Sequence, residues 1–408
     1  MSRIVVAGMP ASGHINPSVP VVGELVRRDI QVTYYATEQF RDTVERTGAE
    51  FRAYPEGTLS SEDIAEATRS GSSVAVVTRA LAATDSLVPF LLADLRDKPP
   101  AAIAFDSNAI WGYMAAAMLG LPKISLMTTV MLGAKDIKVL TAREWAHFLR
   151  VMLPDVPSVI AARRRLLRRF GKQYYPPAPT LPMRGDVTIF PVPRELQSAN
   201  ARIDRSCHFV GPTFDPAVRG GGLDPELAAH VDGRDPLVLV SLGTLHAGSE
   251  AFFRTCFEVL GELPARVLLS VGTHTDPARL GPPPANTLAR TSVPQLDVLR
   301  RAALFVTHGG MNSALEGLAN GVPLVVLPQQ VEQLVIGRAV ADRGAGIVLR
   351  HNVSDRPVPP AELRAAVQRA LADPTMRTAA KAMAARFGEG GGAAAAADVI
   401  QKLLADSR

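Results

Sequence analysis

The sequence predicts an α/β protein built on two doubly wound parallel sheets. Three observations support this fold class. Short apolar runs recur along the 408 residues, with helix-length segments between them. Most of these runs are apolar throughout, as parallel strands are when helices cover both faces of a sheet. A stretch rich in proline and glycine, at 211–226, then separates two halves of similar size.

Each expected strand is a short apolar run. In the first half these runs are 3–9, 31–37, 101–106, 123–129 and 186–192. In the second half they are 237–243, 266–272, 304–310, 323–328 and 345–350. The domains that we expect are a first domain at 1–212, a linker at 213–235, a second domain at 236–385 and a terminal helix at 386–408. Ligands of such sheets bind outside the carboxyl ends of the strands, so two halves that face each other would hold one substrate each.

Composition argues against several classes of protein. The net charge of +5 is mild and is no signature of nucleic-acid binding without a clustered basic face. The two cysteines, Cys207 and Cys256, make no disulfide framework. The apolar run at the start is too short for a signal peptide, and no run reaches the roughly 20 residues of a membrane helix. We expect a soluble cytoplasmic protein with no nucleic-acid partner and no integral membrane segment.

The run ARRRLLRRFGK, at 162–172, is strongly basic and typical of a helix. A solvated helix face is the ordinary explanation for such a run. A contact with an anionic acceptor or with a membrane surface is the alternative. The sequence by itself leaves both open.

A cluster of polar residues and glycines, THGGMNSALEG, stands between an expected strand and an expected helix at 307–317. The start of a helix has unpaired N–H groups and a partial positive charge, so it binds anions. Glycine lets an anion approach the backbone closely. The residues that supply donors or space here are His308, Gly309, Gly310, Asn312 and Ser313. The alternative is a capped helix whose Asn and Ser only close the first turn.

Glu316 lies one turn after Asn312, on the same face of the expected helix. A carboxylate would repel phosphate, but it suits the two hydroxyl donors of a ribose. Together the cluster fits a nucleoside diphosphate. The chain contains no Asp-x-Asp motif, so we expect no metal and no cofactor, with helix dipole and His308 balancing the diphosphate charge.

The run THGGMNSALEGLANGVPLVVLPQQVEQ, at 307–333, resembles the nucleotide-sugar signature of family 1 glycosyltransferases, of the bacterial macrolide and natural-product type. The segments at 8–17, 241–244 and 292–299 fit the same family, so the resemblance covers nearly the whole chain. It implies the GT-B fold, which has two Rossmann-like domains. The acceptor would bind to the first domain and the nucleotide sugar to the second, and the terminal helix would return to the first.

Carried over by position, the resemblance implies a donor site made of Gly243, Thr244, Val293, Gln295, His308, Gly309, Gly310, Asn312, Ser313, Glu316, Glu332 and Gln333. His308 and Thr244 would meet the diphosphate, and Glu316 the ribose. Glu332 and Gln333 would contact hydroxyls of the sugar.

The base of the nucleotide would lie against Gln295 and the backbone of Val293. Many relatives have an aromatic residue where this chain has Ser292, and that residue stacks on uracil. Without it, uracil and thymine are both possible bases.

His14 lies in the segment GMPASGHINP, just after the first expected strand. Gly8 and Gly13 suggest a P-loop, but that motif needs Gly-Lys-Ser/Thr, and here Gly13 precedes His14 and Ile15. An acceptor hydroxyl must lose its proton as it attacks, and neutral imidazole is suited to accept it near pH 7. A lone histidine is more often structural, but its place in the turn and the family resemblance favour a catalytic base.

Asp106 ends the run AAIAFD and would also lie at the carboxyl edge of the sheet. It could simply cap the following helix. The family resemblance implies instead that its carboxylate bonds to His14, which would orient the ring and stabilise the imidazolium. Transfer would then be a single displacement with inversion at the anomeric carbon.

The retained pair Glu332–Gln333 favours a fully hydroxylated hexose, and so UDP-glucose as donor. A dTDP-deoxysugar is the alternative that Ser292 suggests. Apolar stretches at 72–85, 125–133 and 145–153 suit a lipophilic acceptor such as a macrolide, polyketide or flavonoid, although each could equally be an ordinary helix core. The sequence does not indicate the oligomeric state.

Other functions are conceivable on the same residues. A nucleotide-sugar epimerase or a lipid-linked-sugar transferase would use the same fold, and the basic run keeps the second possible. A non-catalytic nucleotide-sugar-binding protein would not need both His14 and Asp106. An NAD-dependent dehydrogenase is disfavoured because no expected strand is followed by Gly-x-Gly-x-x-Gly and an acidic residue at the next strand end.

Overall fold

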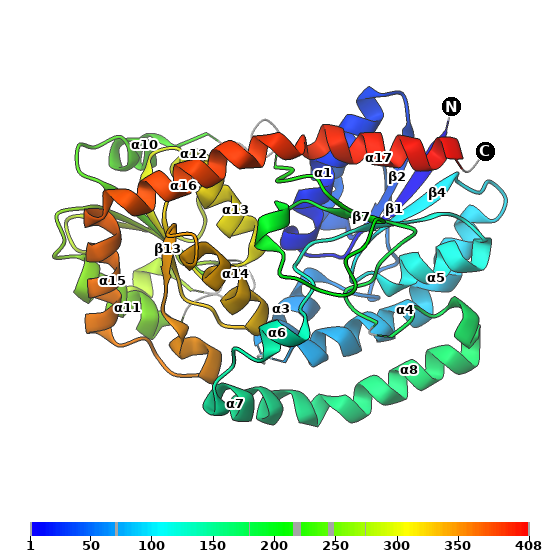
Figure 1. The fold of residues 1–408 in the computed structure, drawn as a ribbon, viewed down its shortest axis with the longest axis horizontal. Helices are drawn as coiled ribbons and strands as arrows, with labels where there is room; N and C mark the ends of the chain where they lie inside the picture. Colours follow the sequence, from blue (N-terminus) through cyan, green and yellow to red (C-terminus); the bar gives the residue numbers. More distant parts are fainter. Residues whose placement is uncertain are drawn as a thin grey trace. The chain divides into compact units, whose positions relative to one another are not determined.

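A computed structural model describes residues 2–69, 72–178, 180–214, 222–243, 249–273 and 275–406. The chain forms two compact units. The first consists of Met1–Gly133, Leu149–Phe214 and Gly388–Arg408, and the second of Ala134–Phe148 and Asp215–Phe387. Each unit is built around one parallel sheet (Figure 1).

The sheet of the first unit has the strand order β3-β2-β1-β4-β5-β6-β7, and every pair is parallel. Its strands are β1 (Arg3–Ala7), β2 (Gln31–Ala36), β3 (Glu50–Ala53), β4 (Ala102–Asp106), β5 (Lys123–Leu126), β6 (Val187–Phe190) and β7 (Cys207–Phe209). The order reverses between β1 and β4, and a parallel sheet opens a crevice at its carboxyl edge at such a point.

Helices pack in layers on this sheet. The helices of the first unit are α1 (Ser12–Arg27), α2 (Arg41–Glu45), α3 (Ser61–Arg69), α4 (Ser73–Leu95), α5 (Ile110–Leu119), α8 (Val156–Phe170) and α17 (Gly392–Asp406). α5 contacts β1, β4 and β5, while α4 lies on α5 and α8 lies on α4. α17 lies along α1, as Figure 1 shows, and the guanidinium of Arg28 donates to Gln401 and to the carbonyl of Ala394.

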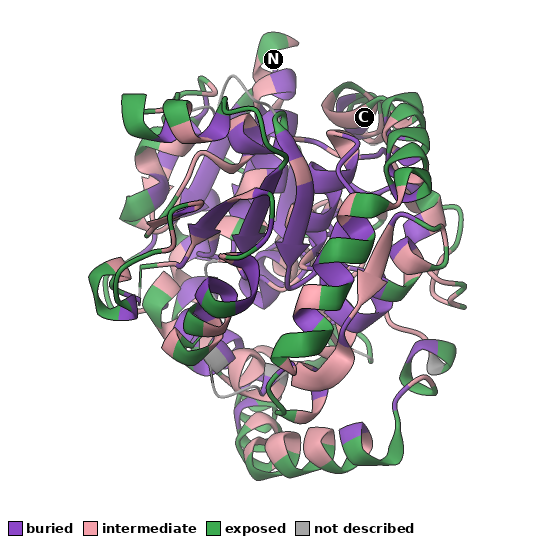
Figure 2. Cartoon of the chain, turned by 90° about the vertical axis from the view of Figure 1, so that its left-hand side faces the viewer, coloured by how far each residue is buried: buried purple, intermediate pink, exposed green. Residues whose placement is uncertain are grey.

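The second sheet has the order β10-β9-β8-β11-β12-β13 and is also entirely parallel. Its strands are β8 (Leu237–Ser241), β9 (Arg266–Ser270), β10 (Thr287–Arg290), β11 (Ala302–Thr307), β12 (Leu324–Val326) and β13 (Gly346–Val348). Here the order reverses between β8 and β11. The central strands are buried on both faces, as Figure 2 shows, which explains why their sequences are apolar without alternation.

The helices of the second unit are α6 (Ala134–Ile137), α10 (Pro225–Val231), α11 (Glu250–Leu260), α12 (Gln295–Leu299), α13 (Met311–Ala319), α14 (Val331–Ala341), α15 (Pro360–Ala372) and α16 (Pro374–Phe387). α7 (Ala142–Met152) has residues in both units. α13 and α14 contact β12, and α15 contacts β11, β12 and β13.

The predicted fold class of two doubly wound parallel sheets is confirmed. All ten expected strands are present. Three strands were not expected, and each is an edge strand: β3, β7 and β10. An edge strand is partly solvated and carries polar residues, as in the sequence EFRA of β3, so it lacks the apolar run that marks a central strand.

The segment 134–148 groups with the second unit, although the domain boundaries expected from the sequence assign it to the first domain. Arg350 forms a bidentate ion pair with Glu144 of this segment, with N–O distances of 2.7 and 2.6 Å. Leu140 packs with Leu334 and Val353 in a small apolar cluster. Sequence patterns within one helix cannot show such a contact, because its partner lies about 200 residues later.

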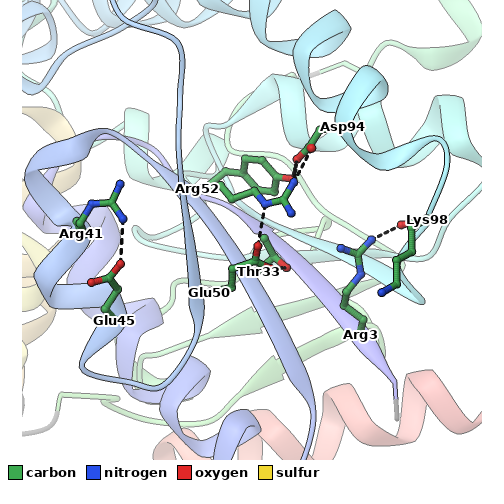
Figure 3. Close-up of polar contacts among 9 residues, drawn as sticks. Arg3, Thr33, Arg41, Glu45, Glu50, Arg52, Asp94 and Lys98 are labelled. Carbon is green, nitrogen blue, oxygen red and sulfur yellow. Dashed lines mark hydrogen bonds and ion pairs between the residues drawn. The ribbon is translucent and has the colours of Figure 1, made fainter.

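Polar contacts also stabilise the edge of the first sheet, as Figure 3 shows. The guanidinium of Arg52, on β3, donates to Glu50 at 3.0 Å and also pairs with Asp94 of α4. Thr33 of β2 donates to Glu50 at 2.8 Å. These bonds tie the edge strand to its neighbour and to the helix that covers it.

One described helix, at Val74–Leu95 within α4, is long and apolar enough to cross a membrane by length and composition alone. In the structure this helix contacts α3, α5 and α8 of its own unit. The core helix of a folded domain passes the same test, and these contacts favour that explanation.

Candidate active site

His14 and Asp106 lie together at the carboxyl edge of the first sheet. His14 is in the first turn of α1, directly after the loop that follows β1, and Asp106 is the last residue of β4. Because β1 and β4 are neighbours at the reversal of strand order, the two residues meet in the crevice. Nδ1 of His14 lies 2.8 Å from Oδ2 of Asp106.

Burial differs between the two partners. The side chain of Asp106 is 5% exposed and that of His14 is 21% exposed. The second carboxylate oxygen of Asp106 accepts the backbone N–H of Asn108 at 2.8 Å, which fixes the carboxylate. A buried, oriented carboxylate next to a partly exposed imidazole is the arrangement that holds a histidine in one tautomer.

Thr128 is a third member of this group, and no sequence motif marks it. Its Oγ1 lies 3.0 Å from Nδ1 of His14 and its residue is 9% exposed. Thr128 follows β5, the strand next to β4, so three adjacent strands deliver one residue each. Thr128 lies two residues after the end of β5 but inside the run 123–129 that was expected to be strand, so the pattern did not distinguish it from its neighbour Thr129.

His308 occupies the matching position in the second unit, directly after β11 and at the reversal between β8 and β11. Its residue is 9% exposed. The ring lies between two glycines, since a Cβ added to Gly243 would lie 2.6 Å from its Cε1 and one added to Gly310 would lie 2.4 Å from its Nε2. Any larger residue at either position would displace the ring.

Gly309 and Gly310 have separate reasons to be glycine. Gly309 has φ +80°, and an added Cβ would lie 2.5 Å from a methyl group of Val326. Gly310 is the residue before α13 and makes no side-chain cap. Asn312 and Ser313 are half-buried in the first turn of this helix. The first N–H groups of α13 therefore have no side-chain cap from Gly310, and such groups bind anions.

Glu316 and Gln295, which were expected at the ribose and the base, contact each other. Nε2 of Gln295 donates to Oε2 of Glu316 at 2.7 Å. Glu316 is only 1% exposed. The amide thus holds the carboxylate in place, at the edge of the sheet where α12 and α13 begin.

Gln333 caps the start of α14, a role that was not expected from the sequence. Its Oε1 accepts the backbone N–H groups of Gln329 and Gln330, at 2.8 and 3.3 Å, and so forms a capping box at the start of α14. The residue is 2% exposed. Its neighbour Glu332 is half-buried in the same turn. Their expected contacts with sugar hydroxyls stay predictions.

The other parts expected of the donor and acceptor sites include the loop before α12, Thr244 and the stretch 145–153. Val293 is half-buried and Ser292 is exposed in the loop before α12. Thr244 lies outside the described residues. Of the stretches expected around an acceptor, 145–153 includes Leu149 and Leu153, and both of these side chains are exposed.

Comparison with known proteins assigns the family. A family model described as the C-terminal domain of erythromycin biosynthesis protein CIII-like proteins matches residues 254–405. Demethyllactenocin mycarosyltransferase of Streptomyces fradiae is similar at 32% identity, with 99% of this chain and 87% of that protein covered. The NDP-glycosyltransferase YjiC of Bacillus licheniformis is 30% identical, with 99% and 98% covered.

The fold agrees with this assignment. The crystal structure of the glycosyltransferase of kitacinnamycin matches with a TM-score of 0.79 and 29% identity, and the match covers 98% of each chain. Two Rossmann-like parallel sheets, a similarity that spans nearly the whole chain and a matching family model lead to one conclusion. The chain belongs to the bacterial family 1 glycosyltransferases of natural-product type, has their GT-B fold and is a glycosyltransferase of the macrolide and antibiotic type.

Proposed function

We propose that this glycosyltransferase moves a hexose, from UDP-glucose, to a hydroxyl group of a lipophilic natural product, with inversion and without a metal. The observation that carries the proposal is the pair of His14 and Asp106, with 2.8 Å between the imidazole and the carboxylate. A protein that only binds nucleotide sugars has no need of an oriented base.

In the proposed reaction the acceptor hydroxyl gives its proton to Nε2 of His14 as its oxygen attacks the anomeric carbon. The new C–O bond forms while the bond from that carbon to the diphosphate breaks, and the nucleoside diphosphate leaves with the electron pair. The carboxylate of Asp106 accepts a hydrogen bond from Nδ1–H of the imidazolium, stays ionised and stabilises its charge. An α-linked donor would give a β-glycoside.

The donor would bind at the corner between β11 and α13. The start of α13 supplies N–H groups and a positive dipole for the diphosphate, and His308 supplies a ring donor. Glu316, held by Gln295, would accept from ribose hydroxyls. Among the described residues no three His, Cys, Asp or Glu side chains gather as a metal site.

A dTDP-deoxysugar donor is the second candidate. The exposed Ser292 offers no aromatic ring to a base, and the related enzyme of Streptomyces fradiae is named a mycarosyltransferase. The capping role of Gln333 also turns its side-chain oxygen towards the backbone N–H groups of Gln329 and Gln330, just before α14. The proposal of UDP-glucose as donor depends on Glu332 and on the side-chain amide nitrogen of Gln333.

We further propose a soluble cytoplasmic protein whose partners are the nucleotide sugar and a small lipophilic acceptor, with no nucleic-acid partner. The packing of α4 against three helices of its own unit supports a core helix over a membrane-spanning one.

The test is calorimetry of UDP, dTDP, UDP-glucose and dTDP-glucose, followed by turnover with a macrolide or flavonoid acceptor in EDTA. Tighter binding of UDP-glucose and formation of a β-glucoside are the expected results. Preference for dTDP would favour the deoxysugar alternative. Donor binding without turnover on any acceptor would favour a non-catalytic protein, and turnover that depends on added Mg²⁺ would contradict the metal-free reaction.

A further inference from the structure

The surface of α7 and α8 combines exposed apolar side chains with arginines. Among the residues that the structure describes, the exposed large hydrophobic side chains are Ile137, Leu149, Leu153 and Ile160, all within one segment of the chain. Leu153 is 59% exposed, and Leu149 and Ile160 are 44% exposed each. The basic run follows immediately in α8, which has no acidic residue from Val156 to its end at Phe170.

Within α8 the spacing of seven residues places Ile160 and the half-exposed Leu167 on one face. Leu149 at the end of α7 and Leu153 in the following turn are exposed just before them, and these four side chains are called the apolar stripe. A short 3-10 turn at Leu153–Asp155 joins α7 to α8. The opposite face of α8 is fixed to the protein, because Ala162 and Leu166 are buried and α8 contacts α4 (Figure 1).

Arginines lie on both sides of this stripe. Arg163 and Arg164 come three and four residues after Ile160, and Arg168 comes one turn later. Arg164, Arg165 and Arg168 are exposed and form no ion pair with any residue that the structure describes. Together with Arg169 and Ala161 they line an open hollow of about 500 Å³. Arg169 differs, since it pairs with Asp85 at 2.7 Å.

We propose that this stripe and its arginines form a docking surface for an anionic lipid bilayer. Leucine and isoleucine would enter the boundary between headgroups and acyl chains, while the arginines would bind lipid phosphates beside them. The charges decide against a second copy of the chain, because a two-fold contact through this surface would bring arginines against arginines. A surface for single-stranded nucleic acid would carry aromatic side chains to stack on bases, whereas this stripe carries aliphatic ones, and a duplex bound through its phosphates would leave those aliphatic side chains without a partner.

Membrane docking of this kind would place the enzyme where lipophilic molecules partition. The inference does not depend on the proposed donor or on His14, since it rests on α7 and α8 alone.

The experiment is co-sedimentation of the full chain with vesicles of phosphatidylcholine, with and without phosphatidylglycerol, at low and high NaCl. Binding to the anionic vesicles at low salt is expected, and weaker binding at high salt. Each arginine near an anionic surface contributes about fivefold to the partition coefficient, so the triple variant Arg164→Gln, Arg165→Gln, Arg168→Gln should lose about a hundredfold.

A matched control removes three other exposed positive charges from one helix. Arg377→Gln, Lys381→Gln and Arg386→Gln, all on α16, change the net charge equally without touching the stripe. The control should keep most of the binding. The variant Leu153→Ser, Ile160→Ser should weaken binding at both salt concentrations. Circular dichroism and turnover in solution should be unchanged by the arginine triple.

Three outcomes would overturn the inference. The first is no binding to anionic vesicles by the unmodified protein. The second is an equal loss in the α16 control, which would indicate attraction by net charge alone. The third is strong binding to RNA without binding to vesicles, which would assign the surface to nucleic acid.

Discussion

Oδ2 of Asp106 lies 2.8 Å from Nδ1 of His14. The other ring nitrogen, Nε2, is the one that would accept the proton of the acceptor hydroxyl. Replacing His14 with Ala should lower kcat by about a hundredfold or more, since general-base catalysis contributes roughly 10²–10⁴. Asp106→Asn should lower kcat in the same direction because an amide no longer selects the tautomer. Steady-state kinetics with unchanged donor KM would check both, and near-normal turnover of His14→Ala would remove it as the base.

Thr128 should have a smaller effect than Asp106. Its hydroxyl lies 3.0 Å from the same nitrogen, and one neutral hydrogen bond is worth about 0.5–1.5 kcal/mol. Thr128→Val, which keeps the shape, should therefore lower kcat about two- to tenfold, and Thr128→Ser should restore most of it. A pH–rate profile should shift in the Val variant, and a profile identical to that of the parent would leave Thr128 as a packing residue only.

His308→Ala should weaken use of the donor and leave the acceptor KM unchanged. A hydrogen bond to a charged group contributes about 1.5–3 kcal/mol, so the donor KM or kcat/KM should worsen at least tenfold. His351→Ala is a matched control in the same unit, since the ring of His351 approaches the carboxylate of Glu362, at 3.6 Å. Unchanged kinetics in His308→Ala would exclude its role at the diphosphate.

Gly310→Ala tests whether the position of the His308 ring matters. The backbone of Gly310 has φ −58°, which alanine adopts without strain, so the only new element is a methyl group 2.4 Å from Nε2 of His308. We expect the donor KM to rise about tenfold or more while overpacking costs about 1–3 kcal/mol of stability. Gly388→Ala is the control, because nothing lies within 4 Å of its added Cβ. A donor KM equal in both variants would argue against a fixed ring.

Arg350→Met should destabilise the second unit at neutral pH. Burial alone would raise the pKa of Glu144, but the hydrogen bonds from Arg350 and Thr141 outweigh it and lower that pKa. A folded pKa below the unfolded value means that the pair stabilises above the unfolded pKa, near 4.5, and that this contribution is lost as the pH falls through the folded pKa.

The pair is partly exposed, because the Arg350 side chain is 35% accessible. We therefore expect Arg350→Met to lower the free energy of unfolding by about 2 kcal/mol, a value between those of exposed and of buried ion pairs. Urea denaturation at pH 7 and below pH 4 would measure it, with the exposed Arg356→Met as control. If the variant and the parent differed in free energy of unfolding by the same amount at both pH values, the effect could not be assigned to the ionised Glu144.

Sequence patterns predicted the central strands well because burial on both faces leaves an unmistakable apolar run. The same reason explains the omissions, since β3, β7 and β10 lie at sheet edges. The positions of His14, Asp106 and His308 at strand ends followed from the βα pattern, and the reversal of strand order explains why those ends are the ones that matter. The pattern could not show which side chains meet.

The contacts of Gln295 with Glu316, and of Gln333 with the backbone just before α14, are examples of this limit. Each residue was expected to face a ligand, and each makes a hydrogen bond within the protein. A glutamine amide satisfies a helix start or a carboxylate equally well, and only the three-dimensional position of the partner decides between them. Thr128 was overlooked because the run 123–129 was expected to be strand, whereas β5 ends at Leu126.

The grouping of α17 with the first unit has a consequence for biosynthesis of the chain. Translation completes the second unit's residues, up to Phe387, before it supplies the helix that lies along α1. Until then the surface of α1 around Arg28 has no partner from α17, so the earlier unit reaches its final packing after the later one has been made. Removal of α17 should therefore leave the surface of α1 around Arg28 without these contacts.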